Sequence, residues 1–132
     1  MTALLDANAL IALVVRDHVQ HDLMGHWWRS WDGGYVTTPS TQASLLRFLV
    51  REGSGIATAT AVLDGVTRHA RHAFWPDDLP YREVDLARVM GHRQVTDAYL
   101  AATARAHGGS VVTLDRGFAA AHPDVAVLLR SG

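Results

Sequence analysis

The sequence contains no cysteine and no lysine among its 132 residues. The absence of cysteine excludes disulfide bonds and thiolate chemistry. All twelve cationic side chains are therefore arginine, and thirteen acidic side chains bring the formal net charge to −1. This balance excludes a strongly basic overall surface of the kind that attracts nucleic acids. GC-rich coding DNA, which favours arginine codons, is the better explanation of the arginine bias. The functional alternative is that guanidinium groups suit bidentate phosphate contacts.

Long apolar runs are also missing, although 48% of the residues are hydrophobic. No stretch approaches the ~20 apolar residues that cross a bilayer, so we expect no membrane association. Asp6 interrupts the first apolar run, and the N-terminus therefore does not resemble a secretory signal. The length suits one domain with its own hydrophobic core. We expect a single cytoplasmic domain spanning residues 1–132.

Short β-type runs alternate with helical patterns along the chain. We expect strands at 3–6, 35–37, 110–114 and 125–129, and helices at 9–14, 17–31, 39–53, 54–66, 83–90 and 97–107, with a helical turn around Phe118. Asn8, Ser54 and Thr96 are the expected caps of three of these helices, and Pro39 suits a first helical turn. Strands that alternate with helices predict an α/β fold, a three-layer α/β/α sandwich with a mainly parallel central sheet.

Three aspartates lie at the edges of these predicted elements. Asp6 ends the first apolar run, Asp115 follows the run at 111–114, and Asp97 opens a helical pattern. In an open parallel sheet, residues just past the carboxyl ends of the strands gather along one edge. Carboxylates brought together there repel one another unless a cation compensates, and hard divalent ions such as Mg²⁺ or Mn²⁺ prefer carboxylate oxygens. The pattern therefore predicts a metal site for phosphoryl chemistry.

Each aspartate also has an ordinary structural explanation. Asp6 suits a helix cap or a turn, Asp115 suits a turn, and a helix N-terminus favours Asp97 whatever its function. Taken singly, these explanations are the better ones, but three acids at one predicted edge favour a shared site. Asn8 and Thr113 are candidates for positioning the acids, with an ordinary strand role favoured for Thr113.

Three segments around these acids resemble the signature blocks of PIN-domain nucleases. They are LLDAN at 4–8, VTDAYLA at 95–101 and VTLDRGF at 112–118. Their order and the chain length also agree, and the likeness is to VapC-type toxins of bacterial toxin–antitoxin pairs. The resemblance implies a single PIN domain with Mg²⁺-dependent endoribonuclease activity, and Mn²⁺ as a substitute ion. It also implies an RNA substrate, homodimerisation and inhibition by a VapB-type antitoxin. It assigns catalysis and metal binding to Asp6, Asp97 and Asp115, through activation of a water that attacks the phosphodiester.

One segment departs from the family pattern. PIN domains commonly carry a glutamate on the helix after the second strand, and here Ser44 stands at that position. A serine can orient a water molecule but supplies no charge, so the number of bound metals, one or two, stays open. An inactive PIN-like module that binds RNA or protein is therefore the alternative function.

Other patterns carry less information. The histidines at 18, 21 and 26 and at 69 and 72 have spacings that permit zinc binding, but surface or interface positions explain them better. A receiver domain also clusters aspartates, but it requires a late lysine that this chain lacks. Adjacent Trp27 and Trp28 cannot both face one core, which favours a partner interface for one of them. Arginines 47, 68 and 71 are candidates for RNA-backbone contacts, although a solvated helix face explains them equally well.

Overall fold

The computed structural model describes residues 1–130 and centres on a five-stranded sheet in which all strands run parallel. The strand order is β3-β2-β1-β4-β5, so the first strand lies in the middle. The strands are β1 (Thr2–Leu5), β2 (Gly34–Thr37), β3 (His72–Phe74), β4 (Ser110–Thr113) and β5 (Ala126–Leu128). Every connection between successive strands carries at least one helix, as parallel strands require. The predicted parallel sheet is therefore confirmed.

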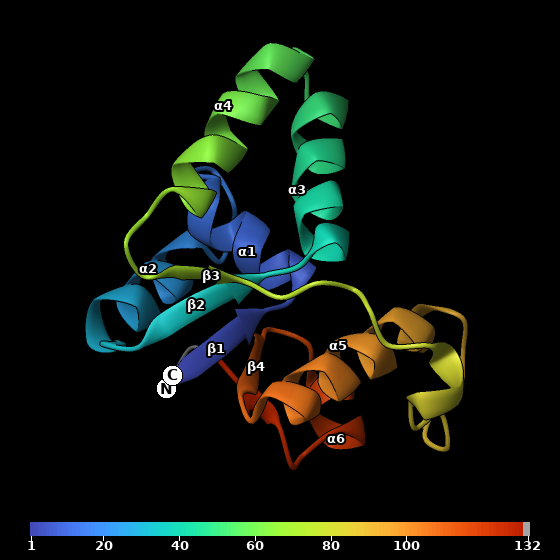
Figure 1. The fold of residues 1–132 in the computed structure, drawn as a ribbon. Coiled ribbons are helices and arrows are strands. Elements are labelled where there is room, and N and C mark those ends of the chain that lie inside the picture. The colour runs from blue at the N-terminus through green and yellow to red at the C-terminus, as the bar shows by residue number, and fades with distance from the viewer. Residues whose placement is uncertain (131–132) are drawn as a thin grey trace.

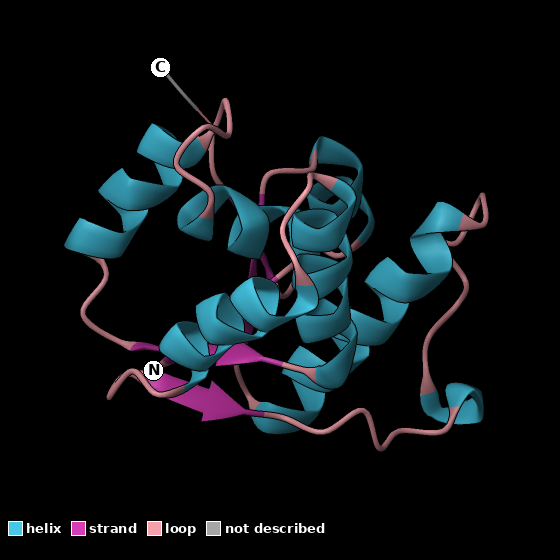
Figure 2. Cartoon of the chain, turned by 90° about the horizontal axis from the view of Figure 1, so that it is seen from above, coloured by secondary structure: helices cyan, strands magenta, loops and turns pink. Residues whose placement is uncertain are grey.

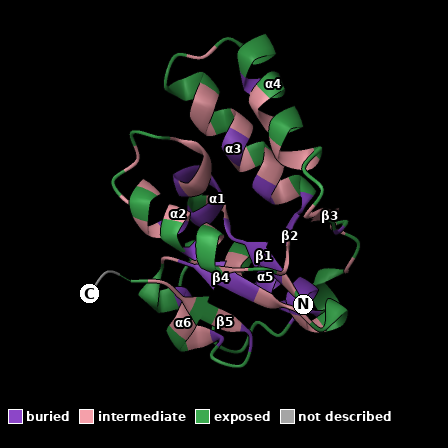
Figure 3. Cartoon of the chain, turned by 90° about the vertical axis from the view of Figure 1, so that its left-hand side faces the viewer, coloured by how far each residue is buried: buried purple, intermediate pink, exposed green. Residues whose placement is uncertain are grey.

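Helices cover both faces of this sheet (Figure 1). One layer contains α1 (Ala7–Val14), α2 (His21–Ser30), α3 (Pro39–Arg51) and α4 (Ile56–Thr67), and the other contains α5 (Arg93–His107) and α6 (Arg116–Ala121). Alternate residues of β1 pack into two different hydrophobic cores, one on each face of the sheet. Ala3 and Leu5 pack with residues of the first layer, whereas Leu4 packs with residues of the second. The three-layer α/β/α sandwich is confirmed, and Figure 3 shows its buried residues concentrated between the layers.

The α3–α4 hairpin extends away from the sheet (Figure 1). Helix α3 starts as predicted, with Pro39 in its first turn and Thr38 as the N-cap. Thr38 and Thr41 form a reciprocal capping box, which satisfies two backbone N–H groups at the helix start. Because α3 follows β2 directly, its first turn lies at the carboxyl edge of the sheet and its last turn lies far from it.

The connection from β3 to α5 is mostly irregular and contains one short 3₁₀ helix, Tyr81–Glu83 (Figure 2). The helix expected at 83–90 is therefore wrong. Leu86 and Met90, which would belong to its apolar face, are 41% and 90% exposed. Without a surface to bury such a face, a short helix is not stable in water.

Three expected helix starts are also wrong. Asp6, not Asn8, caps α1, and Gly55, not Ser54, is the N-cap of α4. Helix α5 begins at Arg93 with His92 as N-cap, so Thr96 is not a cap and Asp97 lies in the second turn. Among residues 1–130, no helix is both long enough and apolar enough to cross a membrane.

Candidate metal centre

The predicted acids lie at the carboxyl edge formed by the two central strands. Asp6 follows β1 directly and Asp115 follows β4 after one intervening residue. The strands are neighbours, with Leu5 opposite Val112, and the Asp6 N–H donates to the Val112 carbonyl at 3.1 Å. Asp97 reaches the same region from the second turn of α5. The topology thus brings together three residues that lie far apart in sequence.

Asp6 is held by hydrogen bonds to both of its carboxylate oxygens. Its Oδ1 accepts from the Ala9 backbone N–H at 2.8 Å, which caps α1. Its Oδ2 accepts from the Thr113 hydroxyl at 2.5 Å, and that hydroxyl also accepts from the Asp115 N–H at 3.0 Å. Thr113 is fully buried. Thr113 has the expected strand position as the last residue of β4, and its side chain also connects the first acid to the third.

Asp115 combines a structural and a site position. Its Oδ1 accepts from the Gly117 N–H at 2.8 Å and caps α6, as the turn explanation expected. The residue is exposed, and its charge raises the pKa of both Asp6 and Asp97. Capping uses one oxygen of Asp6 and one of Asp115, so these structural roles are compatible with the predicted shared site.

The pKa values of two of the three carboxyl groups, Asp6 and Asp97, are raised. Burial, followed by the charges of Asp115 and Asp6, raises the pKa of half-buried Asp97 to about 6. Burial also raises the pKa of Asp6, against the opposing effect of its hydrogen bonds from Thr113 and Ala9, and the charge of Asp115 raises it further. The dipole explanation for Asp97 weakens, because that effect falls off within the first helical turn.

The donor chemistry of this cluster fits a hard divalent cation. Within residues 1–130, no three or more histidine, aspartate or glutamate side chains already stand where they could hold a metal ion together. Mg²⁺ tolerates such an open arrangement, because it keeps several waters and often takes one or two carboxylates together with substrate phosphates. The same finding leaves the histidine-based zinc site without support in the described part of the chain.

Ser44 lies on α3 and supplies no carboxylate. Its hydroxyl donates to the Ser40 carbonyl at 3.1 Å, and its side chain lines a groove beside Ala7 and Asn8. A half-buried acid that sequence reasoning missed, Asp77, lies in the connection between β3 and α5 and contacts the start of α3. Its Oδ2 accepts from the Ser40 N–H at 3.0 Å and from the Ser40 hydroxyl at 2.6 Å, so it fixes the start of α3.

The second oxygen of Asp77 is buried without a hydrogen-bond partner among residues 1–130. Asp77 lines a cavity of about 350 Å³ with Thr96 and Tyr99 of α5. The neighbouring charges that raise the pKa of Asp97 are those of Asp115 and Asp6. The only sequence signal around Asp77 is a stretch from Phe74 to Pro80 with two prolines and two aspartates, which is typical of a strand end or a loop.

The fold is a parallel sheet of order β3-β2-β1-β4-β5 with acids at its central carboxyl edge. Similarity to known proteins identifies the family to which this fold belongs. The PIN-domain profile matches residues 3–122, and the chain belongs to this family. It is 56% identical over 129 residues to Ribonuclease VapC29 of Mycobacterium tuberculosis, covering 98% of this chain and 97% of that protein. It is 40% identical over 128 residues to Ribonuclease VapC39 of the same species, covering 90% and 92%. The predicted family is confirmed.

Solved structures of more distant proteins share the fold. The crystal structure of Mycobacterium tuberculosis VapC20, described as a Sarcin-Ricin loop cleaving toxin, superposes with a TM-score of 0.72 at 17% identity, covering 92% of this chain and 95% of that one. VapBC2 from Rickettsia felis, bound to a DNA fragment from its promoter, gives a TM-score of 0.71 at 15% identity, covering 98% and 100%. At such identities the likeness supports the fold alone.

Proposed function

We propose that this protein is a Mg²⁺- or Mn²⁺-dependent endoribonuclease that acts as the toxin of a toxin–antitoxin pair. The observation that carries the proposal is the convergence of Asp6, Asp97 and Asp115 at one sheet edge, where burial and neighbouring carboxylate charge raise the pKa of Asp6 and bring that of Asp97 to about 6. Strongly perturbed carboxyl groups clustered at one edge are typical of catalytic sites. The likeness to two VapC ribonucleases supports RNA as the substrate.

The protein's own residues prepare this site for a phosphodiester. Asp6, Asp97 and Asp115 would hold the cation, and Thr113 fixes the Asp6 carboxylate through its hydroxyl. When bound, the cation supplies Lewis-acid activation of water and neutralises charge on the phosphate. The Ala9 N–H donates to the other Asp6 oxygen, so hydrogen bonds orient both oxygens of this carboxylate. Hydrolysis of the phosphodiester is the reaction that this arrangement suits.

We further propose a VapB-type antitoxin as the partner and a homodimer as the assembly. VapC relatives and structures of toxin–antitoxin complexes with this fold support the antitoxin. The homodimer rests on the family resemblance. Light scattering of the purified protein, alone and co-expressed with the protein encoded beside it, tests both assemblies.

A second candidate function is an RNA- or protein-binding PIN module without catalysis. Two observations favour it: Ser44 replaces the usual glutamate, and the described residues hold no ready-made metal cluster. The Asp6–Thr113 hydrogen bond favours the nuclease, because a module without catalysis has no need for an ordered, repelling carboxylate cluster.

Metal dependence decides between these functions. The purified protein is incubated with total bacterial RNA in Mg²⁺, in Mn²⁺, in excess EDTA, and in EDTA followed by excess Mn²⁺. We expect cleavage with either ion, none in EDTA, and recovery on adding Mn²⁺. Undiminished cleavage in EDTA would contradict the metal mechanism, and binding without cleavage in every condition would establish the non-catalytic module.

A further inference from the structure

A groove of about 300 Å³ runs between α1 and α3, and none of the three acids lines it. Its lining includes Ala7, Asn8, His18, Arg47, Phe48 and Arg51. One end adjoins the metal centre, because Ala7 and Asn8 directly follow Asp6 on the first turn of α1. The other end lies along the later turns of α3 and beside the segment that follows α1. The groove therefore leads away from the catalytic acids.

The groove carries positive charge without compensating acids. Arg47 and Arg51 are exposed, and no carboxylate lies within 4 Å of either guanidinium in residues 1–130. They are four residues apart on α3, so they share one helix face at a separation of about 6 Å along the axis. The single ion pair within residues 1–130 joins Arg105 and Asp124 on the other layer of the fold. Both groove arginines are thus available to an anionic ligand.

His18 adds a directed donor to the same groove. Its Nδ1 accepts a hydrogen bond from the Gln20 backbone N–H at 3.0 Å. An imidazole nitrogen that accepts from a backbone N–H carries no proton, so the neutral ring bears its proton on Nε2. The half-buried His18 side chain lines the groove together with the two arginines. The donors of the groove therefore come from two separate chain segments.

An aromatic ring lies between the two arginines in sequence. Phe48 is half-buried and lines the groove, and the Arg51 guanidinium carbon lies 5.7 Å from the centre of its ring. Positive side chains beside an aromatic ring are the combination that proteins use to bind single-stranded nucleic acid, with phosphates on the cations and a base against the ring. A groove that binds a protein helix would need a mainly apolar lining, and this one is mainly polar.

We propose that the α1–α3 groove binds the sugar-phosphate backbone of single-stranded RNA on one side of the bond that is cut. The proposal rests on the nuclease function and extends it from the reacting phosphate to the flanking nucleotides. Arg47 and Arg51 bind phosphates, His18 donates to a backbone oxygen, and Phe48 contacts a base. Of the three arginines considered from sequence, only Arg47 lies here. Arg71 instead stacks on Trp28 at 3.9 Å and bonds the Gly33 and Trp31 carbonyls.

The test compares Arg47→Ala/Arg51→Ala with a matched control, Arg29→Ala/Arg68→Ala. The control arginines are also exposed, but they lie at the ends of α2 and α4 that precede β2 and β3, on the opposite edge of the sheet. Binding of a fluorescent mixed-sequence 20-nucleotide RNA is measured by anisotropy in EDTA, from 50 to 300 mM NaCl. Cleavage of the same RNA in Mn²⁺ is measured in parallel, and thermal unfolding confirms that both variants fold.

Loss of two phosphate contacts predicts a fall of about 1.4 in the slope of log affinity against log salt concentration, which corresponds to a dissociation constant about tenfold higher near 0.15 M salt. The control should match the wild type. Equal RNA binding by the two double variants would overturn the proposal. It would also be overturned if the groove variant bound RNA as the wild type does but no longer bound poly-L-glutamate, a result that would indicate a protein-docking surface. Groove-dependent binding without any wild-type cleavage would reject the nuclease function and still support RNA in the groove.

Discussion

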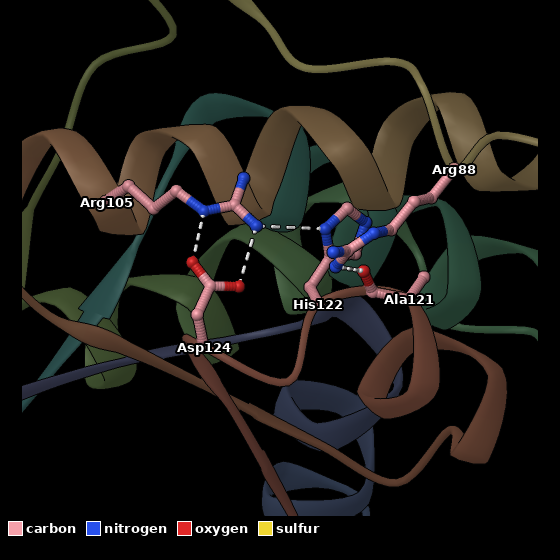
Figure 4. A network of polar contacts seen from close by, with 5 residues as sticks. All are labelled: Arg88, Arg105, Ala121, His122 and Asp124. Atoms are coloured by element: carbon pink, nitrogen blue, oxygen red, sulfur yellow. Dashed lines mark hydrogen bonds and ion pairs between the residues drawn. The ribbon is translucent and has the colours of Figure 1, made fainter.

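The two ends of helix α5 place aspartates in opposite electrostatic surroundings. Near its start, Asp97 faces two other acids, and burial together with their charges raises its pKa to about 6. Near its end, Arg105 bonds both oxygens of Asp124, at 2.6 and 2.9 Å, and the hydrogen bond to Arg105 lowers the Asp124 pKa to about 2 (Figure 4). Arg105 also contacts His122, while Arg88 donates to the Ala121 carbonyl.

This difference separates an ion pair whose charges compensate each other from a group of acids whose charges do not. The Arg105–Asp124 pair joins α5 to the loop before β5 and satisfies both partners, as an ordinary surface ion pair does. The Asp6, Asp97 and Asp115 cluster leaves repulsion uncompensated in the protein alone. Sites that retain such a cost are expected to be functional ones, since packing alone would replace the acids. The predictions below test that contrast.

The largest effect is expected from Asp97→Asn. The change removes one ligand charge, and cleavage should fall on the order of a thousandfold, because a bound cation contributes several kcal/mol to the transition state. Repulsion in the metal-free protein is also relieved, so stability should rise. The expected gain is about 1 kcal/mol, because solvent screens part of the charge of a half-buried group. Single-turnover cleavage and urea unfolding in EDTA measure the two effects. A well-folded Asp97→Asn variant with full activity would refute the site assignment.

The second prediction concerns Thr113→Val, which keeps the side-chain shape but removes the hydroxyl that bonds Asp6. Metal affinity or activity should fall about 10- to 100-fold, because the carboxylate loses its orienting partner. Thr113→Ser should restore most of it. Thr103→Val is the control, since Thr103 is equally buried and bonds only the Tyr99 carbonyl within its own helix. Calorimetric Mn²⁺ titration measures the affinity. Equal losses in the two valine variants would reduce Thr113 to a packing residue.

The third prediction is that the two ends of α5 respond to pH with opposite sign. The Asp97 pKa of about 6 lies above the unfolded value of about 3.9. Ionisation of Asp97 therefore destabilises the folded protein, and this destabilisation is absent below pH 4 and fully present above pH 6. The Asp124 pKa of about 2 lies below the unfolded value. Ionised Asp124 therefore stabilises the folded protein, and this stabilisation is present above pH 4 and lost as the pH falls towards 2.

Unfolding in urea, measured in EDTA for wild type, Asp97→Asn and Asp124→Asn, separates these contributions. The stability advantage of Asp97→Asn over wild type should grow between pH 4 and pH 7. The difference between wild type and Asp124→Asn should stay level over the same interval. A constant advantage for Asp97→Asn would show that its carboxyl group does not titrate near pH 6.

The smallest effect is expected from Asp124→Asn itself. It removes an ion pair whose side chains are 30% and 53% exposed, so the loss of stability at pH 7 should be about 0.5–1 kcal/mol. Cleavage should not change, because Asp124 lies at the opposite end of α5 from Asp97. The same urea and cleavage measurements apply. Loss of activity here would erase the distinction between the two ends of the helix.

Much of the fold was predictable because local patterns agreed with the tertiary structure. The alternation of strands and helices, the Pro39 helix start and the β4 strand all depend on residues close in sequence. The errors fell where distant contacts decide. β3 has only three residues and pairs with β2, so it carries no pattern of its own. The region 83–90 has helix-forming residues but lacks a surface on which a helix could pack.

Residue identity alone was sufficient to predict a class of chemistry for this chain. Aspartates 6, 97 and 115 and the absence of lysine and cysteine were sufficient to predict a cation site, and their signature blocks to predict the PIN family. Only the tertiary structure showed that Thr113 bonds Asp6, that Asp77 fixes α3, and that Arg47 and Arg51 line a groove beginning beside the acids. These relations join residues separated by tens of positions or more, or depend on how α1 packs on α3. Sequence periodicity reports which face of an element is apolar, but not which side chains of separate elements meet.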